Sequence, residues 1–188
     1  MELSEKQRIC LEVAYGDRYP EIVQGFADDT PQRQQYFLEI AERIAPQVLA
    51  AMVKLSGVHK MLNRFKSDDE NLKGLAREIA ENYKYGLPNI ARTVLRDMCG
   101  DFLRIEDSLK NNEISLDDAT REMESVKNSV IAAFKHAIGE VAKNTEIIIP
   151  PNCDEMVDWS RIASVQWQIV MEQEVEKIFE KTIKHWKE

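Results

Sequence analysis

The chain has 188 residues, of which 44% are hydrophobic and 31% are charged, and its formal net charge is −8. This length can bury a core without a metal or disulfide staple. The composition excludes a disordered chain and a membrane-embedded one. The negative charge disfavours nucleic-acid binding, because lysine and arginine must replace the counterions of the phosphates. Seven glycines and six prolines are too few for an all-β chain, which needs frequent turns.

The cysteines and the first residues indicate a cytoplasmic protein. Cys10, Cys99 and Cys153 are widely separated and form no C-x-x-C pair, so neither a disulfide framework nor a thiolate metal site is expected. The first eight residues contain no apolar run of the kind found in signal peptides. We therefore expect a cytoplasmic protein with no membrane contact.

Two short helices are predicted within residues 1–30. Ser4 and Gln7 have the spacing of a capping box, and Gly16 is expected to end the first helix. A second short helix is expected over residues 19–26. The chain then enters its long helices.

Apolar residues at three- and four-residue steps predict a bundle over residues 31–145. Pro46 predicts a kink or a break in its first helix, because proline removes a hydrogen bond and crowds the preceding turn. Gly86 and Pro88 predict the end of one helix and the start of another. The expected bundle helices are 31–65, 67–86, 88–110 and 116–144.

Residues 146–153 are expected to form an extended strap, since Pro150 and Pro151 remove backbone donors. A long helix follows over residues 154–188. The sequence therefore predicts one all-α domain over residues 1–188, a helical bundle of six or seven helices with a long C-terminal helix.

The apolar face of this last helix is expected to change direction. At about 100° per residue, Trp159 and Trp167 lie on one side. The apolar residues after Met171 lie close to the opposite side, where Ser160 and Ser164 precede them. The two halves should then meet different partners, or the helix should bend between Met171 and Glu174. The residues of the candidate interface are Met171, Val175, Ile178, Phe179, Thr182 and Trp186.

This displaced face favours a non-catalytic regulatory or protein-interaction module that associates with itself, or with a protein partner, through the second half of the helix. The four- and three-residue steps of a coiled-coil seam of about two heptads occur at Met171, Val175, Ile178, Thr182 and His185, which is too short to specify a coiled coil alone. The alternative that this half folds back onto its own domain stays open.

A second hypothesis is a sensor domain that binds a small hydrophobic molecule or a cofactor between its helices. Ligands of helical bundles commonly bind there. Its pocket would be lined by aromatic side chains and one histidine, namely Tyr83, Phe102, His136, Trp159 and Trp167. The alternative is that these side chains fill the core. These residue types do not identify which cofactor would bind.

A third hypothesis is a magnesium-dependent phosphohydrolase. Carboxylates one helical turn apart can hold Mg²⁺ together with substrate phosphates, and two such pairs are Glu78 with Glu81 and Asp97 with Asp101. The pairs are partly similar to the glutamate set of the all-α nucleotide pyrophosphohydrolases. In that family an E-x-x-E motif is followed at short range by E-x-x-D, whereas the second pair here has a different spacing. The resemblance implies hydrolysis of nucleotides.

Overall fold

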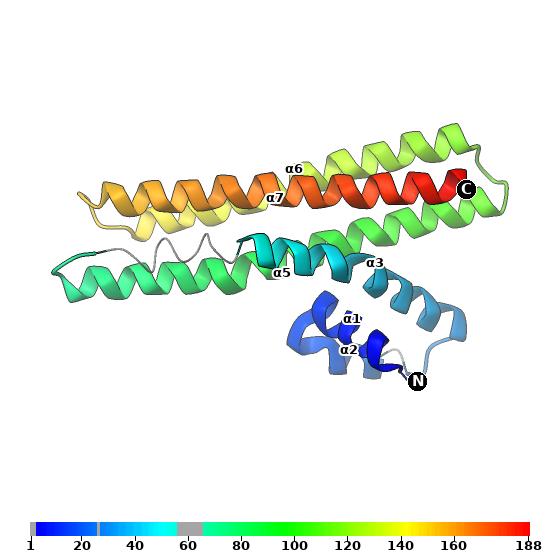
Figure 1. Cartoon of the computed structure of the whole chain (residues 1–188), viewed down its shortest axis with the longest axis horizontal. Coiled ribbons are helices and arrows are strands. Elements are labelled where there is room, and N and C mark those ends of the chain that lie inside the picture. Colours follow the sequence, from blue (N-terminus) through cyan, green and yellow to red (C-terminus); the bar gives the residue numbers. More distant parts are fainter. Residues whose placement is uncertain (1–2, 26, 56–65) are drawn as a thin grey trace.

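The computed structural model describes residues 3–25, 27–55 and 66–188, which are α-helical over most of their length and contain no strand (Figure 1). The element order is α1 (Glu5–Tyr15), the 3-10 helix η1 (Gly16–Arg18), α2 (Tyr19–Gly25), α3 (Pro31–Leu55), α5 (Glu70–Lys110), α6 (Leu116–Ile148) and α7 (Asp154–Lys187). The predicted all-α class is confirmed. Five of the described helices have eleven residues or more, rather than the six or seven helices predicted.

Three long helices, α5, α6 and α7, lie side by side and run alternately up and down (Figure 1). The central partner is α6, which packs against both α5 and α7. In Figure 1 α3 lies across this layer, where it contacts α5 and α7, and α1 packs against α3. The last part of the helix predicted over 31–65, residues 56–65, lies outside the described residues.

The helix starts follow their sequence signals. The amide of Gln7 donates to the hydroxyl of Ser4, and the Ser4 amide donates back to the Gln7 side chain, so the predicted capping box is present. The hydroxyl of Ser115 accepts from the amide of Asp118 at the start of α6. Each cap satisfies amides that have no partner inside the helix.

The expected break at Gly86 and Pro88 is wrong, because α5 continues through both residues from Glu70 to Lys110. Leu87 and Pro88 are buried. A proline inside a helix costs about 3 kcal/mol, whereas burying one large apolar side chain stabilises the fold by about 1.5–3 kcal/mol. The apolar residues that α5 buries on both sides of Pro88 outweigh the missing hydrogen bond.

Pro46 has the effect that the sequence predicts. It lies inside α3, and Figure 1 shows α3 changing direction part of the way along its length. The helix kinks instead of ending, because residues on both sides of the proline, including Ile44 and Val48, are fully buried.

The strap predicted over residues 146–153 is shorter than expected. The helix α6 extends to Ile148, so only the residues from Ile149 to Cys153 connect it to α7. The last turn of α6 is held against α7 by Glu146, whose carboxylate lies 2.7 Å from the guanidinium of Arg161. This contact between helices favours the helical conformation over the extended one predicted from the prolines.

The buried apolar residues form one connected cluster to which α1, α3, α5, α6 and α7 all contribute. Tyr83 and Phe102 are among its largest fully buried side chains. In the part of the chain that the structure describes, no helix combines the length and apolar composition that a membrane crossing requires.

The continuity of α5 predicts whether replacing Gly86 stabilises or destabilises the protein. Gly86 is exposed inside the helix, its φ is not positive, and a Cβ atom there would meet nothing within 4 Å. Gly86→Ala should therefore raise the free energy of unfolding by about 1 kcal/mol, measured by urea denaturation, since alanine loses less backbone entropy.

Gly16→Ala is the matched control. Gly16 has a φ of 66°, and a Cβ there would lie 3.1 Å from Nη1 of Arg92, so alanine should destabilise the protein by about 1–2 kcal/mol. Destabilisation by Gly86→Ala would instead indicate that the helix ends at this residue.

Candidate functional site

The residues of the predicted interface pack inside their own chain. Met171, Val175, Ile178 and Thr182 are buried, while Phe179 and Trp186 are partly buried against the same core. The surface expected to bind a second molecule is therefore covered by α3, α5 and α6. The alternative that this half folds back onto its own domain describes the structure.

The expected change of face in α7 is also wrong. The helix is continuous from Asp154 to Lys187 and nearly straight in Figure 1. Ser160 and Ser164 are buried on the same face as Val175 and Ile178. One face of α7 is thus buried along the whole helix, and it includes the two serines between the buried Met156 and Trp167.

Tyr83 of α5 explains why these serines are buried. Its hydroxyl lies 2.8 Å from Oγ of Ser160 and 3.3 Å from Oγ of Ser164, and all three side chains are buried. A buried phenol needs a hydrogen-bond partner. The two serines supply it, and Ile162 between them lies exposed on the outer side of the helix.

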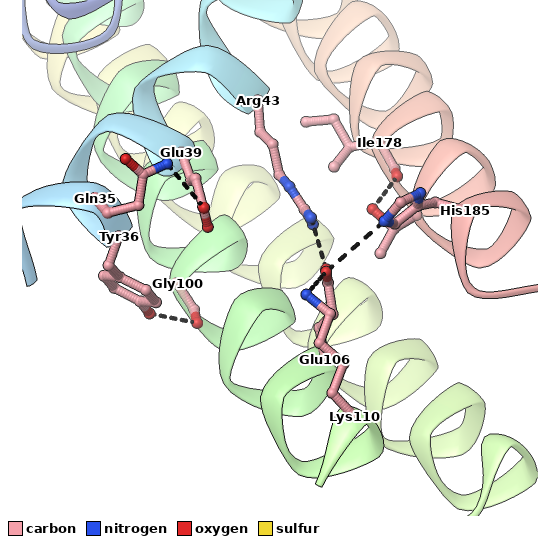
Figure 2. Close-up of polar contacts among 10 residues, drawn as sticks. Gln35, Tyr36, Glu39, Arg43, Gly100, Glu106, Lys110, Ile178 and His185 are labelled. Atoms are coloured by element: carbon pink, nitrogen blue, oxygen red, sulfur yellow. Dashed lines mark hydrogen bonds and ion pairs between the residues drawn. The ribbon is translucent and has the colours of Figure 1, made fainter. Parts of the chain in front are cut away.

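The second half of α7 ends beside a polar cluster around Glu106 (Figure 2). The side chain of this glutamate is only 4% exposed. Its carboxylate accepts from Nη2 of Arg43 at 2.6 Å and lies 2.8 Å from Nζ of Lys110. Nε2 of His185 lies 3.9 Å away. The cluster ties α3 and the C-terminal end of α7 to α5.

Burial alone raises the pKa of the Glu106 carboxyl, but hydrogen bonds from Lys110 and Arg43 and the charges of these two residues outweigh it. The net result is a pKa below the ordinary value. Glu106 is therefore an ionised structural residue, and this carboxyl does not have the raised pKa of a general acid.

The predicted aromatic pocket is not assembled. Tyr83, Phe102 and Trp167 are buried in the core, whereas His136 is exposed on α6. Trp159 is partly buried, and its indole N–H donates to Glu155. The alternative that aromatic side chains fill the core holds for the three buried residues.

The predicted metal ligands do not converge. Glu78 and Glu81 are exposed on α5, and Asp97 and Asp101 lie on the same helix, about 24–35 Å along its axis from the two glutamates. Within the described ranges no cluster of three or more histidine, cysteine or acidic residues has the geometry of a metal site. The third hypothesis therefore lacks its ligand set.

A cleft of about 710 Å³, which the sequence did not indicate, lies between the N-terminal helices, α3 and α5. Its apolar wall includes Ile22, Phe37 and Ile40, and Tyr15 closes one side. Three arginines line it as well, Arg33, Arg96 and Arg104. We call this hollow the arginine cleft.

Aromatic contacts hold the walls of the arginine cleft in place. The rings of Tyr15 and Phe37 are stacked with centroids 5.0 Å apart, and the guanidinium of Arg96 lies 5.9 Å from the Tyr15 centroid. The hydroxyl of Tyr36 donates to the carbonyl of Gly100 at 2.8 Å, as Figure 2 shows. Burial raises the pKa of Tyr15, so its phenol stays neutral. The cleft is thus built from side chains with fixed positions.

The aspartates of the predicted metal site line this cleft instead. A guanidinium nitrogen of Arg96 lies 3.2 Å from Asp97, and one of Arg104 lies 3.9 Å from Asp101. Two arginines beside two carboxylates oppose the binding of a cation. The one feature of the sequence that could have indicated the arginine cleft is the pair Arg96 and Arg104, which lie two helical turns apart with Gly100 between them. Alone it is a weak indication.

Comparison with known proteins adds no relative. No protein-family model, curated protein or solved structure matches the chain.

The polar cluster predicts that Glu106→Gln destabilises the protein. The amide cannot neutralise Arg43 and Lys110 at the edge of the core, so the free energy of unfolding should fall by about 1–3 kcal/mol. The control is Glu122→Gln, since Glu122 is exposed and lies 3.8 Å from Arg104. That variant should change stability by less than about 0.5 kcal/mol. Equal effects of the two variants would contradict the role of Glu106.

The pH dependence of the free energy of unfolding should follow from the Glu106 carboxylate. Since the pKa of Glu106 in the folded chain lies below its ordinary value of 4.5, its stabilising contribution is complete above pH 4.5 and is lost as the pH falls through the folded pKa. Urea denaturation of both proteins from about pH 3 to pH 7 should show a steeper acid loss for wild type than for Glu106→Gln. Parallel curves would contradict this assignment.

Proposed function

We propose that this protein is a helical module that binds a small molecule in the arginine cleft. The observation that carries the proposal is a hollow of about 710 Å³, within the range of about 300–1,000 Å³ typical of small-molecule sites. It combines an apolar and aromatic wall with a few charged groups, which is the usual composition of such sites. The proposal keeps the sensor hypothesis and moves its site to residues of α1, α2, α3 and α5.

The packing of the rest of the bundle supports this location. The aromatic residues first expected to line a pocket fill the core or lie on the surface. The walls of the arginine cleft are instead stacked and hydrogen-bonded to each other across three helices. Binding sites with fixed walls lose little free energy to ordering when a ligand enters.

Ile22→Trp tests the proposed site, because the larger side chain would fill the cleft from α2. Ligand-observed NMR with a library of small fragments should find compounds that bind wild type and fail to bind this variant. Ile162→Trp is the control, since Ile162 is exposed on α7 and lies outside the cleft. Fragments that bind all three proteins equally would refute the site.

The second candidate function is again a protein-interaction module, but with a different interaction surface on α7. Ile162, Val165 and Ile169 are 46%, 53% and 44% exposed, and helical periodicity places them together on the side of α7 opposite Tyr83. Exposed apolar patches often mark contacts between proteins. We propose self-association through this outer face of the first half of α7.

Sedimentation equilibrium tests the second candidate. Wild type should show a dimer whose fraction rises with concentration, and Val165→Asp should be monomeric, because a charge would be buried in the contact. Val53→Asp on α3 is the control, since Val53 is also exposed. A monomer at all concentrations would refute self-association.

A further inference from the structure

A second, more polar compartment adjoins the arginine cleft. It has a volume of about 380 Å³ and lies between η1 and α5. Tyr15, Ile22 and Arg96 line both hollows, so one ligand can extend from one into the other. The polar compartment adds Arg18 and Arg92.

Arg92 carries a charge that no described carboxylate neutralises by a direct ion pair. Its side chain is partly buried, and its Nε donates to the carbonyl of Val13 while Nη1 donates to Asn89, both at 2.9 Å. Among the described residues no carboxylate lies within 4.0 Å of its guanidinium. Burial lowers the pKa of Arg92, and only the more distant Asp17 acts in the opposite direction. A partly buried cation without a carboxylate partner favours an anion nearby.

The other arginines of the polar compartment have partners that a ligand can replace. Arg18 lies 3.6 Å from Glu21, and both side chains are strongly exposed. Arg96 contacts a single oxygen of its sequence neighbour Asp97. Exposed pairs of this kind contribute about 0–1 kcal/mol, so exchanging them for an anionic ligand costs little.

The cationic side chains that line the two compartments are all of one type. Among the described residues that line them there are five arginines and no lysine, and the arginines are Arg18, Arg33, Arg92, Arg96 and Arg104. Arginine binds carboxylate and phosphate groups through two parallel hydrogen bonds, which a lysine cannot do. Asp17, Asp97 and Asp101 also line the hollows, so the positive charges outnumber the negative ones locally in a chain whose net charge is −8.

Gly16 keeps the polar compartment open to Arg92. Its φ of 66° turns the chain between α1 and η1, and a Cβ there would lie 3.1 Å from Nη1 of Arg92. The guanidinium can therefore lie close to the backbone of the turn, where a side chain would crowd it.

We infer that the ligand is an amphipathic oxyanion, a carboxylate or phosphate monoester with an apolar body. Its charged group lies in the polar compartment among Arg18, Arg92 and Arg96, and its body lies in the arginine cleft against Ile22 and Phe37. This inference rests on the proposed function of the cleft and adds the chemical class of the ligand.

Isothermal titration calorimetry of the full chain with octanoate, octyl phosphate and octanol tests the inference, because these probes share one apolar body. At least one of the anions should bind about tenfold or more tightly than octanol, since charge-assisted hydrogen bonds are the stronger kind. The tighter anion identifies the head group as carboxylate or phosphate. Ile22→Trp should weaken binding of the preferred anion.

Arginine variants locate the charged group. Arg96→Gln and Arg18→Gln should each reduce the preference for the anion, with melting curves confirming that both variants fold. Arg77→Gln is the matched control, because Arg77 is exposed on the same helix as Arg96 and lines neither hollow. It should bind like wild type.

Three results would overturn the inference. Octanol binding as tightly as both anions, with Ile22→Trp still blocking it, would refute the charge requirement and leave the proposed function standing. An anion preference that Arg77→Gln reduces as much as Arg96→Gln would show general electrostatic attraction instead of a site. Absence of binding by all three probes would refute this ligand class, and the fragment screen would then decide whether the cleft binds any small molecule.

Discussion

The hydrogen bonds between Tyr83 and the serines of α7 decide how the last helix meets the rest of the bundle. A phenol hydroxyl in the core must find a partner, because leaving it unsatisfied costs about 1–3 kcal/mol. Ser160 and Ser164 supply that partner at 2.8 Å and 3.3 Å. The orientation of α7 about its own axis follows from these contacts.

Once this orientation is set, the C-terminal half of α7 has a defined environment. Val175 and Ile178 continue the buried face, so they pack within the chain and are not free to bind a partner. His185 then lies beside Glu106. The same rotation exposes Ile162, Val165 and Ile169. The exposed apolar face of α7 is therefore the outer side of its first half, opposite the side that hydrophobicity alone indicates.

The arginine cleft exists because the N-terminal helices pack on α3 and α5 from outside the layer that α5, α6 and α7 form. The side of α5 that faces α6 and α7 supplies the core, while Arg96 and Gly100 face α1 and α3. A short helical segment cannot cover a long helix completely, and the space left at this junction is lined by the stacked Tyr15 and Phe37. The buried core residues of α5 and the residues of α5 that line the arginine cleft thus lie on different sides of one helix.

The sequence by itself determined the helical class, the capped helix starts and the kink at Pro46, because these depend on interactions within a few residues of the chain. It did not determine the continuity of α5 through Pro88, the length of α6 or the buried face of α7. In each case contacts between distant residues outweighed the local preference. The arginine cleft was hidden for the same reason, since Tyr15, Arg33 and Arg96 are far apart in sequence and only the packing of three helices brings them together.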